Sequence, residues 1–426
     1  MTHNCEKPQV VLVGGGMITE IQILPSLYHL QRLGLIGEIS ICALNGAPLK
    51  KIAANKILKK AFPGQGFTPY PNFKKVDPEK PFPNLYREVL EKAPAKSISV
   101  VAVPDQLHYR TVKDSLEREK HVLVVKPLVL KYKEAVELEK MALEKGLFVG
   151  VEYHKRFDDR SLITRGKYRS GDFGEFRLGY VSLIEPWYYR NSNFQNWCTT
   201  ENSDMFTYIG CHYVDLVAFI TGLLPVEVSV YGVVESYPNG NKGYLWTNGR
   251  VIWNNGACLA VLNGMGYPNA APGGNSQGMT LFCRGEKDGA LVMHDDQYRG
   301  VKHSYITKGP DEGDKYYNEV SPDYFKLIDL GGPGLTPVGY GHRSVEAIVR
   351  AIRRVEKAAA GAKTAPQALK KRQAEIKAID KEGIIATPAN SSYNELVVEA
   401  GRMSIKNGSR PVVIEYGKNA RVRFRA

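Results

Sequence analysis

The first third of the chain alternates short apolar runs with helical patterns of apolar and polar residues. Amphipathic stretches such as 18–33 and 133–145 separate the apolar runs, which lie at residues 9–13, 39–44, 97–103, 121–125 and 147–151. Apolar strands that alternate with helices are typical of a parallel, doubly wound α/β sheet. Pro25 falls inside the first predicted helix and should bend it. The stretch 63–83, rich in proline and glycine, predicts an ordered loop region.

The pattern changes after about residue 152, where strand-like runs follow one another directly. We predict strands at 176–184, 226–234, 250–262, 279–284 and 290–294, with turn signals at 238–240, 254–256 and 287–289. One helix, at 204–221, interrupts them. Helices at 344–359, 365–381 and 391–407 and a strand at 411–416 complete the chain. This pattern predicts an α+β domain with a large, open and mostly antiparallel sheet.

The length of 426 residues predicts two domains. We place a dinucleotide-binding α/β domain at 1–152 and a substrate-binding and oligomerisation domain at 153–426, with the option that helices 344–407 pack back on the first. The net charge of +13 favours anionic ligands. Much of the excess lies in 350–381, which reads as solvated helix, and no nucleic-acid recognition module accompanies it.

Six scattered cysteines predict neither a metal cage nor a disulfide framework. The N-terminus lacks the apolar core of a signal peptide, and no apolar run reaches the roughly 20 residues that span a bilayer. We therefore expect a cytoplasmic protein with no membrane or nucleic-acid partner and no metal.

A glycine turn follows the first apolar run. Gly14 permits a tight turn, and Gly16 lets the backbone approach a phosphate. Met17 and Ile18 begin a helix whose free N–H groups and dipole favour an anion. Thr19 stands where the usual Gly-x-Gly-x-x-Gly pattern has its third glycine. The segment predicts the binding of a dinucleotide pyrophosphate.

The end of the second run carries Asn45, where a fold that prefers NAD usually has Asp or Glu. The amide can bind a ribose hydroxyl but does not repel a 2′-phosphate, and Lys50 and Lys51 follow closely. The cofactor therefore stays open between NAD and NADP, with NAD favoured.

Two later strand ends carry polar side chains. Pro104 and His108 follow the run at 97–103, where the cofactor should lie, although a solvent-facing histidine fits equally well. Lys126, followed by Pro127, ends the run at 121–125, and both are also candidate cofactor-binding residues. Because desolvation of an ammonium is costly, a lysine there suggests a task, such as stabilising negative charge on a substrate hydroxyl. The alternative is a surface lysine that caps the strand.

The helix at 204–221 places Tyr208, His212 and Asp215 on one face. An imidazole oriented by Asp215 suits proton transfer from an alcohol, whereas a hydrogen-bonded core histidine is the alternative.

Two other segments mix aromatic and polar residues, which suits the faces and hydroxyls of a sugar but also a subunit interface. The candidate substrate-binding residues are His154, Arg156, Trp187, Asn196 and Trp197.

Together these segments resemble the glucose-fructose oxidoreductase / inositol dehydrogenase family (Gfo/Idh/MocA) over nearly the whole chain. The matching pieces, in order, are 14–18, 103–108, 126–127, 153–157, 210–222 and 339–344. The resemblance implies a Rossmann domain, an antiparallel sheet that commonly forms an oligomer interface, and sugars, sugar derivatives or inositols as substrates. It also implies that Lys126 is the family's Glu-Lys-Pro lysine and His212 its catalytic histidine.

Three residues depart from the family pattern. Val125 replaces the glutamate before the lysine, Tyr208 stands where sugar and inositol dehydrogenases often carry Asp, and Asn45 replaces the acidic ribose ligand.

The leading hypothesis is an NAD(P)-dependent oxidoreductase that acts on a hydroxyl of a sugar, glycoside or related polyol, as a homodimer or tetramer. His212 would accept the proton, Lys126 would hold the hydroxyl, and Tyr208 would position a neighbouring hydroxyl. A second hypothesis is an enzyme with captive NAD that oxidises a sugar transiently, for epimerisation or glycosidic-bond cleavage without net redox. A third, less favoured, is a non-catalytic nucleotide-binding scaffold.

Overall fold

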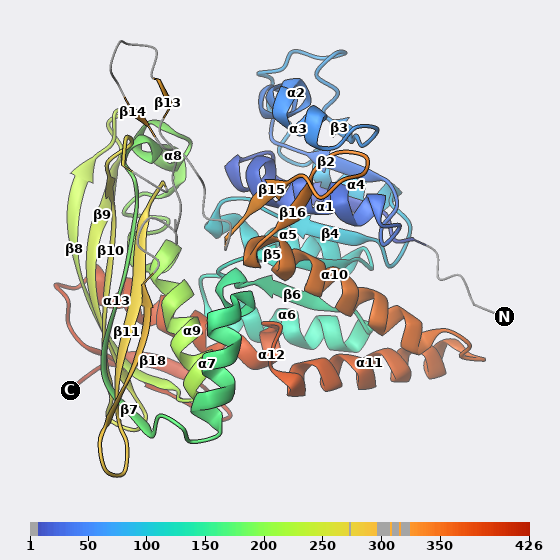
Figure 1. The fold of residues 1–426 in the computed structure, drawn as a ribbon. Helices are drawn as coiled ribbons and strands as arrows, with labels where there is room; N and C mark the ends of the chain where they lie inside the picture. Colours follow the sequence, from blue (N-terminus) through green and yellow to red (C-terminus); the bar gives the residue numbers. More distant parts are fainter. Residues whose placement is uncertain (1–6, 272–273, 296–306, 309–314, 317–323) are drawn as a thin grey trace. The chain divides into compact units, whose positions relative to one another are not determined.

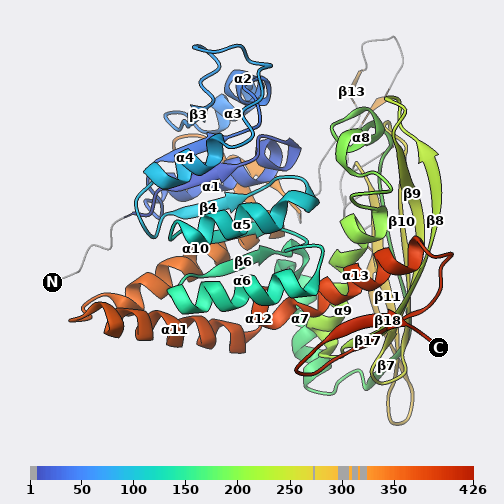
Figure 2. The same cartoon turned by 180° about the vertical axis from the view of Figure 1, so that it is seen from behind.

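A computed structural model describes residues 7–271, 274–295, 307–308, 315–316 and 324–426 (Figures 1 and 2). The chain divides into two compact units. The first unit comprises Met1–Val129, Lys133–His154 and Leu327–Asn390, and the second comprises Leu130–Tyr132, Lys155–Lys326 and Ser391–Ala426. The first unit thus combines the N-terminal part of the chain with a segment from far along the sequence. The predicted boundary between residues 152 and 153 stays a prediction.

The first unit is built on a parallel sheet of six strands in the order β3-β2-β1-β4-β5-β6. The strands are β1 (Val10–Val13), β2 (Ile39–Cys42), β3 (Thr68–Tyr70), β4 (Ile98–Val101), β5 (His121–Val125) and β6 (Val149–Glu152). Central strands such as β1 are buried along their whole length, as expected when helices cover both faces of a parallel sheet. The sheet confirms the predicted doubly wound α/β fold.

Helices α1 and α10 cover one face of this sheet, and α4 and α5 cover the other. The C-terminal α10 therefore completes the core of the N-terminal sheet. The helical elements are η1 (Thr19–Ile23), α1 (Leu24–Arg32), α2 (Ala47–Ala54), α3 (Lys56–Ala61), α4 (Leu85–Lys92), η2 (Asp105–Leu107), α5 (His108–Glu117), α6 (Tyr132–Lys145), α10 (Tyr340–Ala359), α11 (Ala365–Glu382) and α12 (Pro388–Ser391).

Two local predictions for this unit need correction. The stretch 63–83 is not loop throughout, because Thr68–Tyr70 forms β3; Pro69 is tolerated there because β3 is the edge strand of the sheet. The helix expected at 18–33 is present, but its first part is the π-helical η1, which continues without a break into α1, with Pro25 in the first turn of α1.

A partly buried polar cluster connects the C-terminal helices to the sheet. The Nε2 atom of His121, on β5, lies 2.9 Å from an oxygen of Glu356 on α10, and Arg372 on α11 donates to both oxygens of the same carboxylate at 2.7 Å. His121 Nδ1 accepts from the backbone N–H of Phe148, so Nε2 carries the proton. Burial would raise the pKa of Glu356, but the bonds from His121 and Arg372 outweigh it and lower that pKa to about 2.

The second unit is built on an eight-stranded sheet in the order β12-β11-β7-β10-β9-β8-β17-β18. All neighbouring strands are antiparallel except the parallel pair β7 and β10. The strands are β7 (Glu175–Pro186), β8 (Pro225–Ser236), β9 (Lys242–Trp253), β10 (Cys258–Tyr267), β11 (Ser276–Arg284), β12 (Gly289–Asp295), β17 (Val412–Glu415) and β18 (Arg421–Phe424). The mostly antiparallel α+β prediction is confirmed.

The single strand predicted at 250–262 is wrong. It is a hairpin in which β9 ends at Trp253 and β10 begins at Cys258, and Gly256 adopts a positive φ of 82° in the turn between them. Of the predictions for this segment, the turn at 254–256 is confirmed.

Helical elements α13 and η5 pack on one face of the large sheet, whereas the opposite face carries exposed apolar side chains. The helical elements of this unit are α7 (Asp159–Arg169), η4 (Trp187–Asn191), α8 (Phe194–Trp197), η5 (Phe206–Gly210), α9 (Cys211–Thr221) and α13 (Tyr393–Ile405); η3 (His154–Phe157) spans the division between the units. Short strand pairs are formed by β13 (Thr307–Lys308) with β14 (Lys315–Tyr316), and by β15 (Lys326–Ile328) with β16 (Thr336–Val338). Across the described ranges, no helix is long and apolar enough to cross a membrane.

Candidate functional site

The glycine turn between β1 and η1 has the geometry that a pyrophosphate needs. Gly14 has a φ of +121°, and a Cβ there would lie 2.0 Å from the carbonyl oxygen of Ala102, so only glycine fits. A Cβ on Gly16 would meet nothing within 4 Å, which leaves the backbone open to a ligand. Thr19, in place of the third glycine, is buried and donates to the Gly14 carbonyl at 2.8 Å. This hydrogen bond holds the turn in its conformation. Met17 and Ile18 begin the helix that follows the turn.

The residue expected to meet the ribose lies at the start of α2. Asn45 is partly buried, and its Oδ1 accepts from the backbone N–H of Ala47 at 3.3 Å. Lys51 pairs with Glu20 at 3.0 Å, whereas Lys50 is exposed. A contact between Asn45 and a ribose stays a prediction.

His108 is fully buried, with 0% exposure, between two strand ends. Its Nδ1 lies 2.6 Å from the carbonyl oxygen of Pro127, and its Nε2 lies 2.8 Å from that of Val103. The ring thus ties the loop after β4 to the loop after β5, next to Lys126. This geometry favours an internal positioning role over the predicted contact with the cofactor, while Pro104 beside it is partly buried.

Lys126 directly follows β5 and is only 9% exposed. The register of the sheet pairs the preceding Val125 with Glu152 at the end of β6. The position where the family carries a glutamate is therefore opposite a carboxylate on the neighbouring strand.

Glu152 is the centre of a hydrogen-bond network that the sequence did not reveal. Its carboxylate accepts from Gln22 at 2.9 Å and from Ser344 at 2.5 Å, and its second oxygen lies 3.1 Å from Nδ1 of His154. The His154 ring stacks on Tyr340, with 5.5 Å between centroids. Three segments distant in sequence are joined here, and the Gly-Tyr-Gly-His-Arg-Ser motif at 339–344 was the available signal.

The histidine helix begins with a π-helical turn. Asp204 caps it by accepting from the backbone N–H of Thr207 at 2.7 Å and from its hydroxyl at 2.9 Å. A π-helical turn inside a helix often marks a functional site. Tyr208, in this turn, is partly buried, and His212 one turn later is 5% exposed.

Tyr208 lies in an aromatic cluster with Phe194 and Trp197. Its ring meets those of Phe194 at 4.9 Å and Trp197 at 5.6 Å, both edge to face. The structure thus brings together two residues that the sequence analysis assigned separately to catalysis and to substrate binding. Asn196 is exposed and accepts from Asn239 at 3.1 Å.

Trp187 belongs to a different cluster, on η4. The guanidinium of Arg190 lies 3.9 Å from the Trp187 ring centroid and also forms an ion pair with Glu235. Glu235 accepts from Trp246 Nε1 at 3.0 Å, and the Trp246 ring covers Gly266, where a Cβ would lie 1.9 Å from it. Trp187 is thus held by a structural cation–π contact, and its predicted role in substrate binding stays untested.

Asp215 and Arg156 form a buried ion pair. The guanidinium donates to the two carboxylate oxygens at 2.7 and 2.5 Å, and the side chains are 2% and 1% exposed. Tyr393 and Asn394, at the start of α13, donate to the same carboxylate at 3.0 and 2.9 Å. Burial and the Asp215 carboxylate raise the pKa of Tyr393 well above its ordinary value, so it stays a donor. These contacts anchor Asp215 and Arg156 inside the unit, and the orientation of His212 by Asp215 and the substrate contact by Arg156 stay predictions.

Among the described residues, no three His, Cys, Asp or Glu side chains gather as metal ligands would.

Residues 9–153 match the sequence profile of the oxidoreductase family with an NAD-binding Rossmann fold, GFO_IDH_MocA. Two curated relatives are an uncharacterized oxidoreductase, C26H5.09c, of Schizosaccharomyces pombe (31% identical over 147 residues, 33% of this chain and 39% of the relative) and the scyllo-inositol 2-dehydrogenase (NADP(+)) IolW of Bacillus subtilis (25% over 138 residues, 32% and 38%). The chain therefore matches less than half the length of these relatives.

The likeness in fold extends over nearly the whole chain. The crystal structure of GenD2 from gentamicin A biosynthesis, in complex with NAD, aligns with 97% of this chain and 98% of its own, with a TM-score of 0.66 and 16% identity. The sequence match over residues 9–153 identifies an NAD-binding Rossmann domain. Over residues 9–153 the chain is similar to the NAD-binding Rossmann domain of the Gfo/Idh/MocA oxidoreductase family.

Proposed function

We propose that this protein is an NAD(P)-dependent dehydrogenase that acts on a hydroxyl of a sugar, glycoside or related polyol. The observation that carries the proposal is the glycine turn at Gly14, which excludes any side chain, followed in the same unit by Lys126 at the end of β5. Its relative IolW is a scyllo-inositol 2-dehydrogenase, which supports a polyol substrate.

The residues of the turn fit a dinucleotide. The open backbone at Gly16 and the helix start at Met17 and Ile18 would hold the pyrophosphate, and Asn45 would hold a ribose hydroxyl. When bound, the nicotinamide would supply the hydride acceptor or donor.

The remaining roles are assigned to three side chains. Lys126 would hold the reacting hydroxyl and stabilise negative charge that develops on its oxygen. His212 would accept the hydroxyl proton as a general base. Tyr208 would position a neighbouring hydroxyl, with Trp197 providing an apolar face for the ring of the substrate.

The test is turnover with a panel of sugars and inositols, followed by reduced-nicotinamide absorbance. Lys126→Ala and His212→Ala are each expected to lower kcat by at least about a hundredfold, the scale of a lost acid–base group, while the Kd of His212→Ala for NADH stays close to that of the wild type. Lys133→Ala, which removes an exposed lysine on α6, is the control and should keep full turnover. Near-normal turnover of both site variants would refute these roles.

A second candidate is an enzyme that keeps its NAD and oxidises the sugar only transiently. The observation that favours it is Tyr208, a second group able to transfer a proton, one turn before His212. Mass spectrometry of nucleotide released on denaturation distinguishes the two. Stoichiometric NAD with deuterium exchange at a sugar carbon, and without net reduction, would support the captive-cofactor reaction. A protein purified without nucleotide would support the exchanging dehydrogenase.

We also infer that the protein is a homo-oligomer through the large sheet. Five strands expose apolar side chains on the same face of the sheet, 39% to 62% exposed: Leu178, Tyr180, Tyr231, Leu262, Phe282 and Met293. The exposed Asn248 of β9 lies between Leu262 and Tyr231. Patches of this kind mark protein–protein interfaces. Light scattering coupled to size exclusion should give a dimer or tetramer, and Leu262→Glu should shift it toward the monomer. A monomeric wild type would refute the inference.

A further inference from the structure

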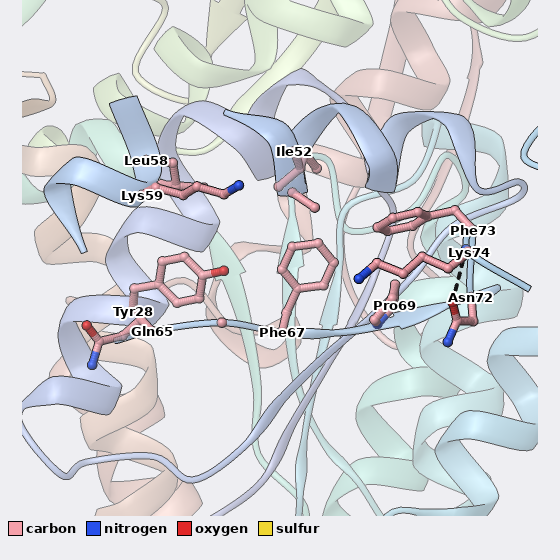
Figure 3. A pocket seen from close by; sticks show the side chains of 12 residues that line it. Tyr28, Ile52, Leu58, Lys59, Gln65, Phe67, Pro69, Asn72, Phe73 and Lys74 are labelled. Atoms are coloured by element: carbon pink, nitrogen blue, oxygen red, sulfur yellow. Dashed lines mark hydrogen bonds between the residues drawn. The ribbon is translucent and has the colours of Figure 1, made fainter. Parts of the chain in front are cut away.

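A second concave site lies in the first unit, between α1, α2, α3 and the segment around β3 (Figure 3). Its volume is about 330 Å³. This is at the lower end of the roughly 300–1,000 Å³ typical of pockets that hold small ligands. None of the residues that line it is a predicted cofactor or substrate residue.

The walls of this cavity are apolar and partly aromatic. Ile52 of α2 and Leu58 of α3 form one side, and Phe67 and Phe73, which flank β3, face them (Figure 3). Such walls suit a flat apolar body.

A buried hydroxyl points into the cavity. Tyr28 on α1 is only 4% exposed, and its ring packs against Phe62 at 5.6 Å. Figure 3 shows its oxygen directed toward Phe67, and the described residues provide no hydrogen-bond partner for it. Burial raises the pKa of Tyr28, so the hydroxyl stays protonated and can donate. The hydroxyl oxygen is itself open to the cavity, so it is available to donate to a ligand or to solvent there.

The mouth of the cavity is positively charged. Lys59 and Lys74 line it, and neither forms an ion pair with any described residue, in contrast to Lys51, which pairs with Glu20. Residues 47–75 contain seven lysines and no Asp or Glu. The local field therefore favours an anion.

We propose that this cavity binds a small aromatic carboxylate, separately from the cofactor and the sugar. The ring lies between Phe67 and the aliphatic wall, and the carboxylate accepts from the Tyr28 hydroxyl and pairs with the ammonium groups of Lys59 and Lys74. The acceptor-only chemistry of a carboxylate matches the donors Tyr28, Lys59 and Lys74, which line the cavity beside the amides of Gln65 and Asn72. This proposal does not depend on the proposed dehydrogenase activity.

The test is isothermal titration of the full chain with 2-naphthoate, in the presence of saturating NADH. One saturable site is expected, and 2-naphthamide, which has the same ring but no charge, should bind at least about tenfold more weakly. Tyr28→Phe and the double variant Lys59→Ala/Lys74→Ala should each weaken the binding of 2-naphthoate by about tenfold or more. The double variant Lys60→Ala/Lys75→Ala removes two neighbouring exposed lysines that do not line the cavity, and it should leave the affinity unchanged.

Three results would overturn the proposal. They are the absence of saturable binding at millimolar 2-naphthoate, equal losses in the two double-lysine variants, and binding that is unaffected by Tyr28→Phe together with Lys59→Ala/Lys74→Ala. Loss of all binding on addition of NADH would also overturn it, because the probe would then have occupied the cofactor site.

Discussion

The buried pair of Arg156 and Asp215 allows a quantitative test of its role. Asp215→Asn keeps the size of the side chain but removes the charge that compensates the guanidinium. Because both side chains are at least 98% buried, water cannot replace the lost carboxylate. The donors Tyr393 and Asn394 would also lose a charged acceptor.

The expected cost follows from these contacts. Removal of one partner from a buried ion pair typically costs about 3–5 kcal/mol, because it leaves an uncompensated charge. The second unit has about 200 residues, for which 1 kcal/mol corresponds to roughly 2–4 °C in Tm. We therefore expect Asp215→Asn to lower the Tm of this unit by on the order of 10 °C.

The chain offers a specific assay for this unit. All four tryptophans, Trp187, Trp197, Trp246 and Trp253, lie in the second unit, so tryptophan fluorescence follows its unfolding and not that of the first. The control is Asp172→Asn, which breaks the exposed pair with Lys167 and should cost no more than about 1 kcal/mol.

The double variant Arg156→Met/Asp215→Leu sharpens the test. Removal of both charges avoids the uncompensated guanidinium, so the double variant should lose less stability than the sum of the two single changes. A Tm shift below about 3 °C for Asp215→Asn, or strictly additive losses, would refute the anchoring role. The kcat of Asp215→Asn, measured well below its Tm, should fall less than that of His212→Ala; an equal fall would restore the predicted role of Asp215 in orienting the imidazole.

Three further predictions follow from single contacts. The pKa of Glu356 is about 2 in the folded state, below the 4.5 of the unfolded chain, so its bonds stabilise the protein above pH 4.5 by up to about 3 kcal/mol, and this stabilisation is lost as pH falls toward 2. Glu356→Gln should therefore be less stable at pH 7, and its stability to urea should depend less on pH between pH 5 and 3 than that of the wild type. An unchanged pH dependence would contradict this. Gly266→Ala should lower the free energy of unfolding by about 1–3 kcal/mol because the added methyl group would meet Trp246. Gly166→Ala, in open space on α7, should be neutral or stabilising. The midpoints of urea unfolding, followed by fluorescence, compare the two variants. Gly14→Ala should weaken the binding of NADH at least about tenfold, because the methyl group would block the turn. A Kd for NADH equal to that of the wild type would exclude the predicted cofactor site.

The sequence predicted those parts of the fold in which local pattern and structure agree. Apolar runs of five to seven residues predicted five of the six strands of this sheet: β1, β2, β4, β5 and β6. β3 was missed because three residues that include Pro69 carry no apolar period. Most of β9 was missed because its first half, from Lys242 to Asn248, mixes polar and glycine residues with the apolar ones. The parallel pairing of β7 with β10 could not be predicted, since strand pairing is not a local property.

The candidate site shows the same division between local and distant information. His212 and Asp215 lie three residues apart on one helix, and this spacing alone suggested that they act together. The partners of Asp215 come from positions 59 and 178 residues away in the chain, Arg156 and Tyr393. A sequence pattern cannot show which side chains from distant parts of the chain will bind a carboxylate in the folded protein. The structure therefore adds an anchoring role for Asp215 and Arg156, and the roles predicted for these two residues stay proposals, like those of Lys126, His212 and Tyr208.

The Glu152 network gives a structural role to the motif at 339–344, which the sequence analysis identified only through the family resemblance. Ser344 and Tyr340 lie about 190 residues after Glu152, yet one donates to its carboxylate and the other stacks on His154 beside it. Gln22, just after the cofactor turn, binds the same carboxylate. The helix behind the pyrophosphate turn, the end of β6 and the start of α10 are thus held by a single buried anion. Loss of that anion would release three segments at once, so the late motif secures the edge of the sheet where the cofactor is expected to bind.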